Sequence, residues 1–338
     1  MINETLLIVG KAATNYQKAA IEYFESYSDA TEKYGVNHFS EAFKIAQSFG
    51  MTGVHMANIQ SLDEYFSLSS FITEYNFTYV VFLDLYLSDT YADPISGKET
   101  SYLQYILEKS TDTSTVFFIT GKHASLYNDI DSFIRDTKQE IDTFKKRCST
   151  NIDLRNVQYV ANNLNNYDFG NLILALMFLA TDVSEYPNTR NLPQVTLGEA
   201  IFYIDNFDIN ELDFSYFKTT SLTGTTIENL LNLQTFKSPL KIAFIDRIVR
   251  YITKLINFDD YIGQGYSEYK RAMIAEKEKT ILESLKNRII SDYTVHECYA
   301  VQNTSYPGTV VVILTVSIVP IGIMEEVKIS IKKSAVLT

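Results

Sequence analysis

The sequence of 338 residues is poor in the side chains that most often carry chemistry or hold a small fold together: it has no tryptophan, two cysteines and four histidines. Cys148 and Cys298 lie far apart, which excludes a disulfide framework and fits a reducing cytoplasm. His296 and Cys298 are close in sequence, but two groups on one strand cannot close a metal site. We therefore expect no bound metal.

Basic residues are also scarce. The chain has 29 Lys and Arg against 41 Asp and Glu, for a net charge of −12. Its only basic cluster, Lys145-Lys146-Arg147, is flanked by acidic residues and has the pattern of a solvated helix end. Neutralising phosphates requires clustered Lys and Arg, so the charge balance excludes nucleic acid as a partner.

The sequence pattern also predicts neither an export signal nor a membrane-spanning segment. The first residues, Met1 to Thr5, have no basic region or cleavage site, so we expect no signal peptide. The apolar run Val310 to Met324 is shorter than the roughly 20 residues of a membrane helix. It is rich in β-branched residues and contains Pro320, which predicts a strand and no membrane insertion.

Catalytic motifs are equally hard to find. Gly10-Lys11-Ala12 follows an apolar run but lacks the Gly-x-x-x-x-Gly-Lys pattern of a phosphate loop, and no Gly-x-Ser-x-Gly elbow occurs. Thr120-Gly121-Lys122-His123 and the pair Asp84 and Asp89 also follow apolar runs, with no assignable base or nucleophile. We predict no catalytic residues and no cofactor. A small-molecule-binding α/β enzyme that uses the loops after Gly10, Asp84 and Gly121 stays open as an alternative.

The first half of the chain alternates short apolar runs with helical periodicity. The predicted strands are Leu6–Val9, Gly53–Ile59, Tyr79–Leu83, Thr115–Ile119 and Val157–Val160, and the predicted helices are Phe39–Gly50, Ser61–Tyr75, Ser101–Lys109, Tyr127–Lys146 and Leu172–Ala180. Continuous apolar strands between helices predict an α/β fold with a mostly parallel sheet. A Pro- and Asn-containing linker at 186–193 divides the chain into an α/β domain, residues 1–186, and a C-terminal α+β domain, residues 187–338.

The C-terminal domain is predicted to end in strands. A helix opening at Ser238-Pro239 carries a basic stripe, and a second helix spans Ser267 to Asn287. An extended run follows at Ile289–Val295, and then come the long strand Thr309–Val319 and the strand Val327–Ile331. The basic stripe consists of Lys241, Arg247, Arg250 and Lys254.

The last two strands differ in pattern. The strand from Val310 to Val319 is apolar on both faces and should be central in a sheet, whereas Val327, Ile329 and Ile331 alternate with polar residues, as in an edge or exchanged strand. Burying these three aliphatic side chains contributes about 1.5–3 kcal/mol each. An exposed strand edge is a template for pairing with another chain, so this ending points to self-association. An ordinary edge strand within one subunit is the alternative.

Four segments carry a resemblance to a known family: Leu6–Ala12; Ser28–Gly35 with the helix and strand that follow it; Asn162–Asp168; and the C-terminal elements from Ile245 to Ile331. In this order and layout the chain resembles the tail sheath proteins of contractile phage tails and related contractile bacteriocins. The resemblance covers most of the chain and is most specific in the C-terminal elements.

The resemblance implies a virion structural protein with no enzyme activity, located in the viral tail and assembled in the cytoplasm of the bacterial host. Its subunits would form stacked hexameric rings around a tail tube, linked by arms that add strands to neighbouring subunits, and would contract to drive the tube through the target envelope. Its partners would be copies of itself, the tube protein, and baseplate and tail terminator proteins.

Two sets of residues follow as candidate contacts between subunits. Val327, Ile329 and Ile331 would form the inter-subunit strand, and the basic stripe of Lys241, Arg247, Arg250 and Lys254 would meet an acidic patch on the next subunit or on the tube. A solvated helix face is the alternative for the stripe.

The chain departs from the family at its start. Only Met1 to Thr5 precede the first core strand, and five residues span at most about 17 Å, which is short for a strand-exchanging arm. Compressed arms, or a sheath-like terminator, initiator or non-contracting protein, are the alternatives. The first strand is also a candidate for joining the C-terminal sheet.

Overall fold

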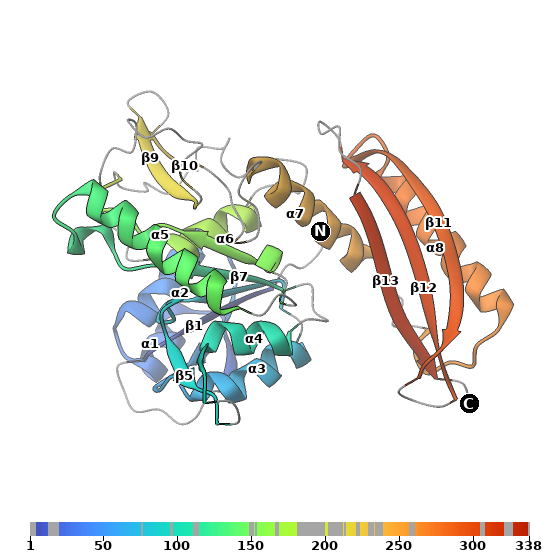
Figure 1. Ribbon diagram of the computed structural model, residues 1–338, viewed down its shortest axis with the longest axis horizontal. Coiled ribbons are helices and arrows are strands. Elements are labelled where there is room, and N and C mark those ends of the chain that lie inside the picture. Colours follow the sequence, from blue (N-terminus) through green and yellow to red (C-terminus); the bar gives the residue numbers. More distant parts are fainter. Residues whose placement is uncertain are drawn as a thin grey trace. The chain divides into compact units, whose positions relative to one another are not determined.

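The computed structural model in Figure 1 describes residues 5–12, 20–75, 77–94, 97–110, 115–148, 152, 154–165, 169–180, 200–201, 212, 214–220, 224–228, 233, 239–256, 261–304, 308–320 and 327–336. Side chains are described from 247 onward in the segment 239–256, and none are described in 327–336. The chain divides into two compact units, residues 3–243 and 244–338. The predicted linker at 186–193 lies outside the described residues, so the predicted boundary stays a prediction.

A six-stranded sheet forms the centre of the first unit. Its order is β2-β3-β1-β4-β7-β8, and all neighbours are parallel except the edge pair β2–β3. The strands are β1 (Leu6–Gly10), β2 (Ile21–Phe24), β3 (Val54–Asn58), β4 (Tyr79–Phe82), β7 (Val116–Thr120) and β8 (Val157–Val160). Small antiparallel pairs lie outside this sheet: β5 (Thr90–Ala92) with β6 (Glu99–Ser101), and β9 (Tyr216–Thr220) with β10 (Gly224–Glu228).

Helices cover both faces of the sheet. On one face lie α1 (Tyr27–Tyr34), α2 (His38–Ser48) and α6 (Gly170–Ala180), and on the other lie α3 (Glu64–Tyr75), α4 (Tyr102–Lys109) and α5 (Ile130–Arg147). Neighbouring residues of β1 illustrate the reason, because Ile8 belongs to the first core and Leu7 and Val9 belong to the second. Each strand residue is therefore buried on one side or the other, which explains the continuous apolar runs.

The first strand lies inside this sheet. β1 pairs with β3 through Leu7–Gly10 and with β4 through Leu6–Val9, and all five of its residues are buried. The sequence left open whether this strand joins the C-terminal sheet; it does not, because a strand that is apolar on both faces needs helices on both sides, and the α/β unit provides them.

Local signals set the limits of α2. Asn37 accepts a hydrogen bond from the backbone of Ser40 in a capping box, which satisfies donors at the helix start. The helix ends before Gly50, which has a positive φ of 90°, and glycine adopts this conformation without steric cost. The predicted ending at Gly50 is confirmed.

The second unit contains α7 (Pro239–Leu255, which begins just before the division), α8 (Glu268–Leu285), and three long strands: β11 (Ile290–Gln302), β12 (Thr309–Pro320) and β13 (Val327–Val336). The strands form an antiparallel sheet in the order β11-β12-β13. β12 is central and β13 is at the edge, as predicted. The predicted fold class, an α/β layer with a mostly parallel sheet followed by an α+β part ending in strands, is confirmed.

Candidate assembly surfaces and the carboxyl edge of the parallel sheet

The C-terminal sheet packs one face on α8. The even-numbered residues of β12 from Val310 to Ile318 are buried, with Leu314, Val316 and Ile318 no more than 2% exposed. On α8 the buried residues include Ile274, Leu282 and Leu285, and α8 lies against β11. Apolar side chains on both elements therefore fix the helix to the sheet.

The predicted inter-subunit strand pairs within its own chain. In the β12–β13 register, Val327, Ile329 and Ile331 are opposite Ile318, Val316 and Leu314, in that order. The three aliphatic residues thus align with the most buried positions of the central strand. Their role between subunits stays a prediction, and any exchange has to replace these pairings with equal ones from another copy.

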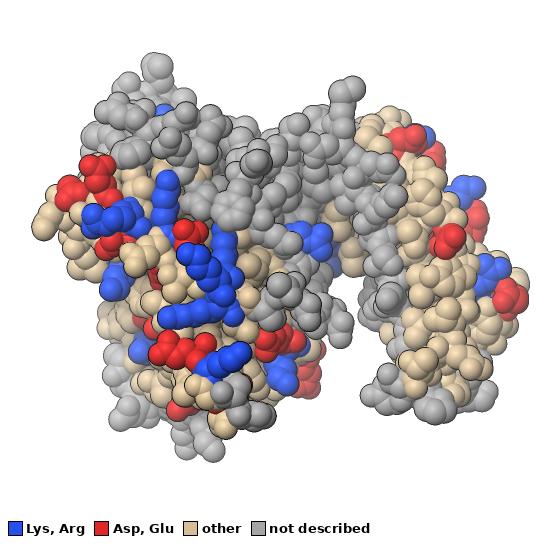
Figure 2. Space-filling model, viewed as in Figure 1, with Lys and Arg blue, Asp and Glu red and all other residues tan. Residues whose placement is uncertain are grey.

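β11 forms the other edge of the sheet and is largely exposed. Its register against β12 shifts between Ile290 and Asp292 and again between Val295 and Glu297. Such irregularities make an edge a poorer template for indiscriminate pairing. Tyr299 is 41% exposed, and the surface over β11 and β12 carries few charges in Figure 2.

The basic residues of α7 do not share one exposed face. Arg247 is 5% exposed, Arg250 and Lys254 are half-buried, and the side chain of Lys241 lies outside the described residues. Ile248, the neighbour of Arg247, is also buried, as are Ile252 and Ile256 further along the helix. The expectation of four residues on the polar side is therefore corrected for Arg247, whose side chain is buried including its Nε. Contacts with another subunit stay a prediction.

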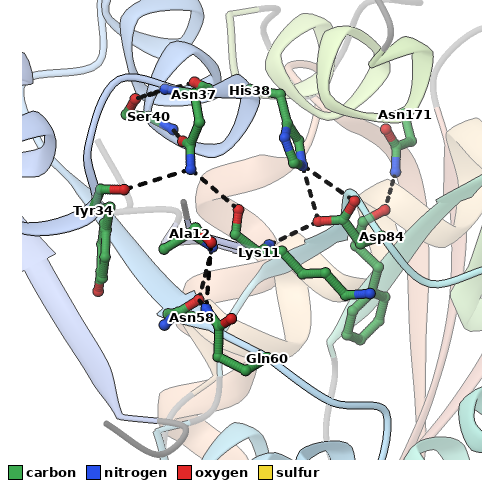
Figure 3. Close-up of polar contacts among 11 residues, drawn as sticks. Lys11, Ala12, Tyr34, Asn37, His38, Ser40, Asn58, Gln60, Asp84 and Asn171 are labelled. Atoms are coloured by element: carbon green, nitrogen blue, oxygen red, sulfur yellow. Dashed lines mark hydrogen bonds and ion pairs between the residues drawn. The ribbon is translucent and has the colours of Figure 1, made fainter. Parts of the chain in front are cut away.

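The loops of the enzyme alternative meet at the carboxyl ends of β1 and β4, the place where open α/β sheets bind ligands. Figure 3 shows the hydrogen bonds and ion pairs that the polar groups at this edge form. The backbone N–H of Lys11 donates to Asp84 Oδ2 at 2.7 Å, and His38 Nε2 lies 3.1 Å from both carboxylate oxygens of Asp84. The N–H of Ala12 donates to Asn58 Oδ1 at 2.8 Å. Asp84 and its neighbours thus bind the chain's own loop.

A buried asparagine closes the next part of this edge. Asn171 on α6 is fully buried, and its Nδ2 donates to the carbonyl oxygens of Phe82 at 2.6 Å, at the end of β4, and of Phe118 at 3.2 Å, in the middle of β7. A Cβ on Gly10 would lie 2.9 Å from Phe39, so side chains already fill the space beside the first loop. The polar groups therefore hold helices on the sheet.

Side chains also fill the space beside the third loop, at Gly121. A Cβ there would lie 2.1 Å from Tyr159 Oη, which donates to Glu140 Oε2 at 3.2 Å. Burial raises the pKa of Glu140. His123 Nε2 lies 2.8 Å from the carbonyl oxygen of Leu164. Sequence reasoning identified these loops but missed Asn171, Tyr159 and Glu140, which lie in helical or apolar patterns typical of core elements.

The two cysteines are both free, and Cys148 is not activated. Burial raises the pKa of Cys148 to about 12, which disfavours the thiolate. In the part of the chain that the structure describes, no group of three or more His, Cys, Asp or Glu side chains could hold a metal ion. No described helix is both long and apolar enough to cross a bilayer.

Comparisons with known proteins are informative at the level of structure. No family model matches the sequence, and no curated protein matches it. The fold is similar to the helical sheath of the anti-feeding prophage in its contracted state (TM-score 0.61, 14% identity, covering 95% of this chain and 90% of that one). It is also similar to a sheath tail protein from Listeria innocua (TM-score 0.65, 10% identity, 97% and 94% covered).

A further similar structure is the sheath complex of the PVC extracellular contractile injection system in its contracted state, with a TM-score of 0.57, 12% identity, and 99% and 88% coverage. Both units are included in these matches. The chain therefore has the fold of contractile tail sheath proteins, and the resemblance seen in the sequence is confirmed for the fold.

Proposed function

We propose that this protein is a structural subunit of a contractile tail sheath and has no enzymatic activity. The observation that carries the proposal is the similarity of nearly the whole chain, both units included, to three sheath structures. A fold by itself hosts many functions. Here the C-terminal sheet adds a physical reason for self-association, because β13 is an edge strand among the described strands and an edge strand is a template for pairing with another copy.

In the proposed assembly, copies of the chain stack as hexameric rings around a tail tube and contract to drive it through an envelope. The tube protein, baseplate proteins and a tail terminator are the further partners, and the tail of the particle is the location. A sheath-like terminator, initiator or non-contracting protein is the alternative within this proposal.

The enzyme alternative has less support. Its three loops do lie at the carboxyl ends of neighbouring strands, but Asp84, Asn171 and Tyr159 use their polar atoms on the chain itself. Saturable nucleotide binding that is lost on changing Lys11 or Lys122 would restore it.

The proposal is tested by negative-stain electron microscopy of the purified full chain, in which we expect rings or tubes. Deletion of 326–338 should abolish them and leave a soluble monomer with a folded α/β unit.

A sharper test compares two variants. One replaces Val327, Ile329 and Ile331 by threonine, and the other replaces the alternating Lys328 and Lys332 by threonine. We expect only the first replacement to prevent assembly. Tubes from the truncated chain would refute the role of the last strand, and a strict monomer in the wild type would refute the proposed function.

A further inference from the structure

The buried face of α8 contains one acidic residue. Ile274, Glu278, Leu282 and Leu285 follow each other at helical spacing and are 8%, 0%, 0% and 4% exposed. These residues form the seam between α8 and the C-terminal sheet, visible in Figure 1 where α8 lies against β11. Glu278 therefore interrupts an otherwise apolar seam close to the middle of the helix.

The carboxyl group of Glu278 lacks the partners that usually accompany burial. Both of its oxygens are buried, and neither accepts a hydrogen bond. Ionising such a group in place is costly because water is excluded. Burial accordingly raises the pKa of Glu278 from 4.5 to about 8.

The elements around the seam offer few other charges. On β11, Cys298 is half-buried with its Sγ 3.8 Å from the Arg271 carbonyl, and burial raises the pKa of its thiol. On α8 itself, the guanidinium of Arg271 is bonded to Glu268 and to the Cys298 carbonyl. Lys277 lies over the ring of Tyr261, 5.5 Å from its centroid.

The other two strands of the C-terminal sheet are β12 and β13. The buried residues of β12 on this face are aliphatic, and include Val312, Leu314 and Val316. On β13, the register places Lys333 opposite Val312, and Ile329 and Ile331 opposite the two following buried positions. Burial is thus the cause that dominates the titration of Glu278.

We propose that Glu278 makes the closure of α8 on the C-terminal sheet dependent on protonation, and that its ionisation loosens the seam between the helix and the sheet. The neutral carboxyl is compatible with the apolar seam, whereas the carboxylate requires water and therefore favours the open form. α8 lies against β11, and β11 is paired with the central strand β12, so loosening of the seam is expected to reach the hydrogen bonds of β12.

The direction of the pH effect follows from linkage. With the pKa raised in the closed form, the open form releases its proton first as the pH increases. Closure is therefore most favourable near and below pH 4.5, and weakens progressively until about pH 8. Acid closes the seam and mild alkali opens it.

The test measures amide hydrogen exchange of residues 309–320 in the full chain between pH 5 and 9. Comparing the wild type with Glu278→Gln at each pH cancels the intrinsic pH dependence of exchange. We expect the ratio of wild-type to variant exchange rates to rise by about tenfold or more between pH 5 and pH 8. Glu276→Gln, at an exposed position of the same helix, is the matched control and should exchange like the wild type.

Glu278→Met provides a second variant that cannot titrate, and it should show the same flattened pH dependence. A wild-type ratio that stays constant across the range, against both variants, would overturn the inference. Microscopy of the same samples separates this result from the proposed function. If the ratio of exchange rates rises with pH but the protein never forms rings or tubes, only the proposed sheath function is refuted. If the ratio stays flat but the protein does form them, only the proposed protonation dependence of Glu278 is refuted.

Discussion

Replacing Asn171 by aspartate tests whether the carboxyl edge of the parallel sheet is a structural joint. The Nδ2 group of Asn171 is the donor for two buried carbonyl groups, on Phe82 and Phe118. An aspartate of nearly the same shape removes that donor and aims an acceptor at both carbonyl oxygens. Each buried group left unsatisfied costs about 1–3 kcal/mol, so we expect a loss of about 3–5 kcal/mol in the free energy of unfolding.

For a unit of this size the loss corresponds to a decrease in Tm of about 10 °C. Thermal unfolding of the full chain measures it, and amide exchange over residues 170–180 assigns the change to α6. A protonated aspartate can donate one hydrogen bond, so the loss should shrink as the pH falls toward 5. Asn128→Asp makes the same chemical change at an exposed position and is the control. If both variants unfold within about 1 kcal/mol of each other, the reasoning about this joint is refuted.

Gly121→Ala should destabilise the α/β unit by about 1–3 kcal/mol, measured by urea unfolding, because its Cβ would lie 2.1 Å from the buried Tyr159 hydroxyl. The double reversal Arg250→Glu with Lys254→Glu should weaken assembly most at low salt, measured by sedimentation across a salt titration, because exposed ion pairs of about 0–1 kcal/mol each are screened. Elemental analysis of the purified protein should find neither zinc nor iron in stoichiometric amounts.

The Gly121→Ala substitution and the double charge reversal of Arg250 and Lys254 each have a matched control. A Cβ on Gly265 would meet nothing within 4 Å, so Gly265→Ala should leave stability unchanged. Lys279→Glu with Arg288→Glu reverses two exposed charges of the same unit and should leave assembly unchanged. Equal stability of the two alanine variants, or equal salt dependence of the two charge reversals, would contradict the corresponding prediction.

In the first unit, the strands that sequence patterns predicted are those of the parallel sheet, which are buried on both faces. Leu6–Val9 and Tyr79–Leu83 are continuous apolar runs, and such runs specify burial without knowledge of their neighbours. The strands missed are β2, β5, β6, β9 and β10, which are three to five residues long with mixed polarity. Their conformation depends on a partner strand that is distant in sequence or presented by a turn, so local residues carry little signal for it.

The sequence by itself determined the alternation of strands and helices, the central place of β12 and the ending of α2 at Gly50. These features depend on local periodicity and on the conformational freedom of single residues. Only the tertiary structure decided that Arg247 and Glu278 are buried, since both lie in helices whose charged residues are typical of solvated faces. Burial is a property of what packs against a helix, and that packing partner comes from residues far along the chain.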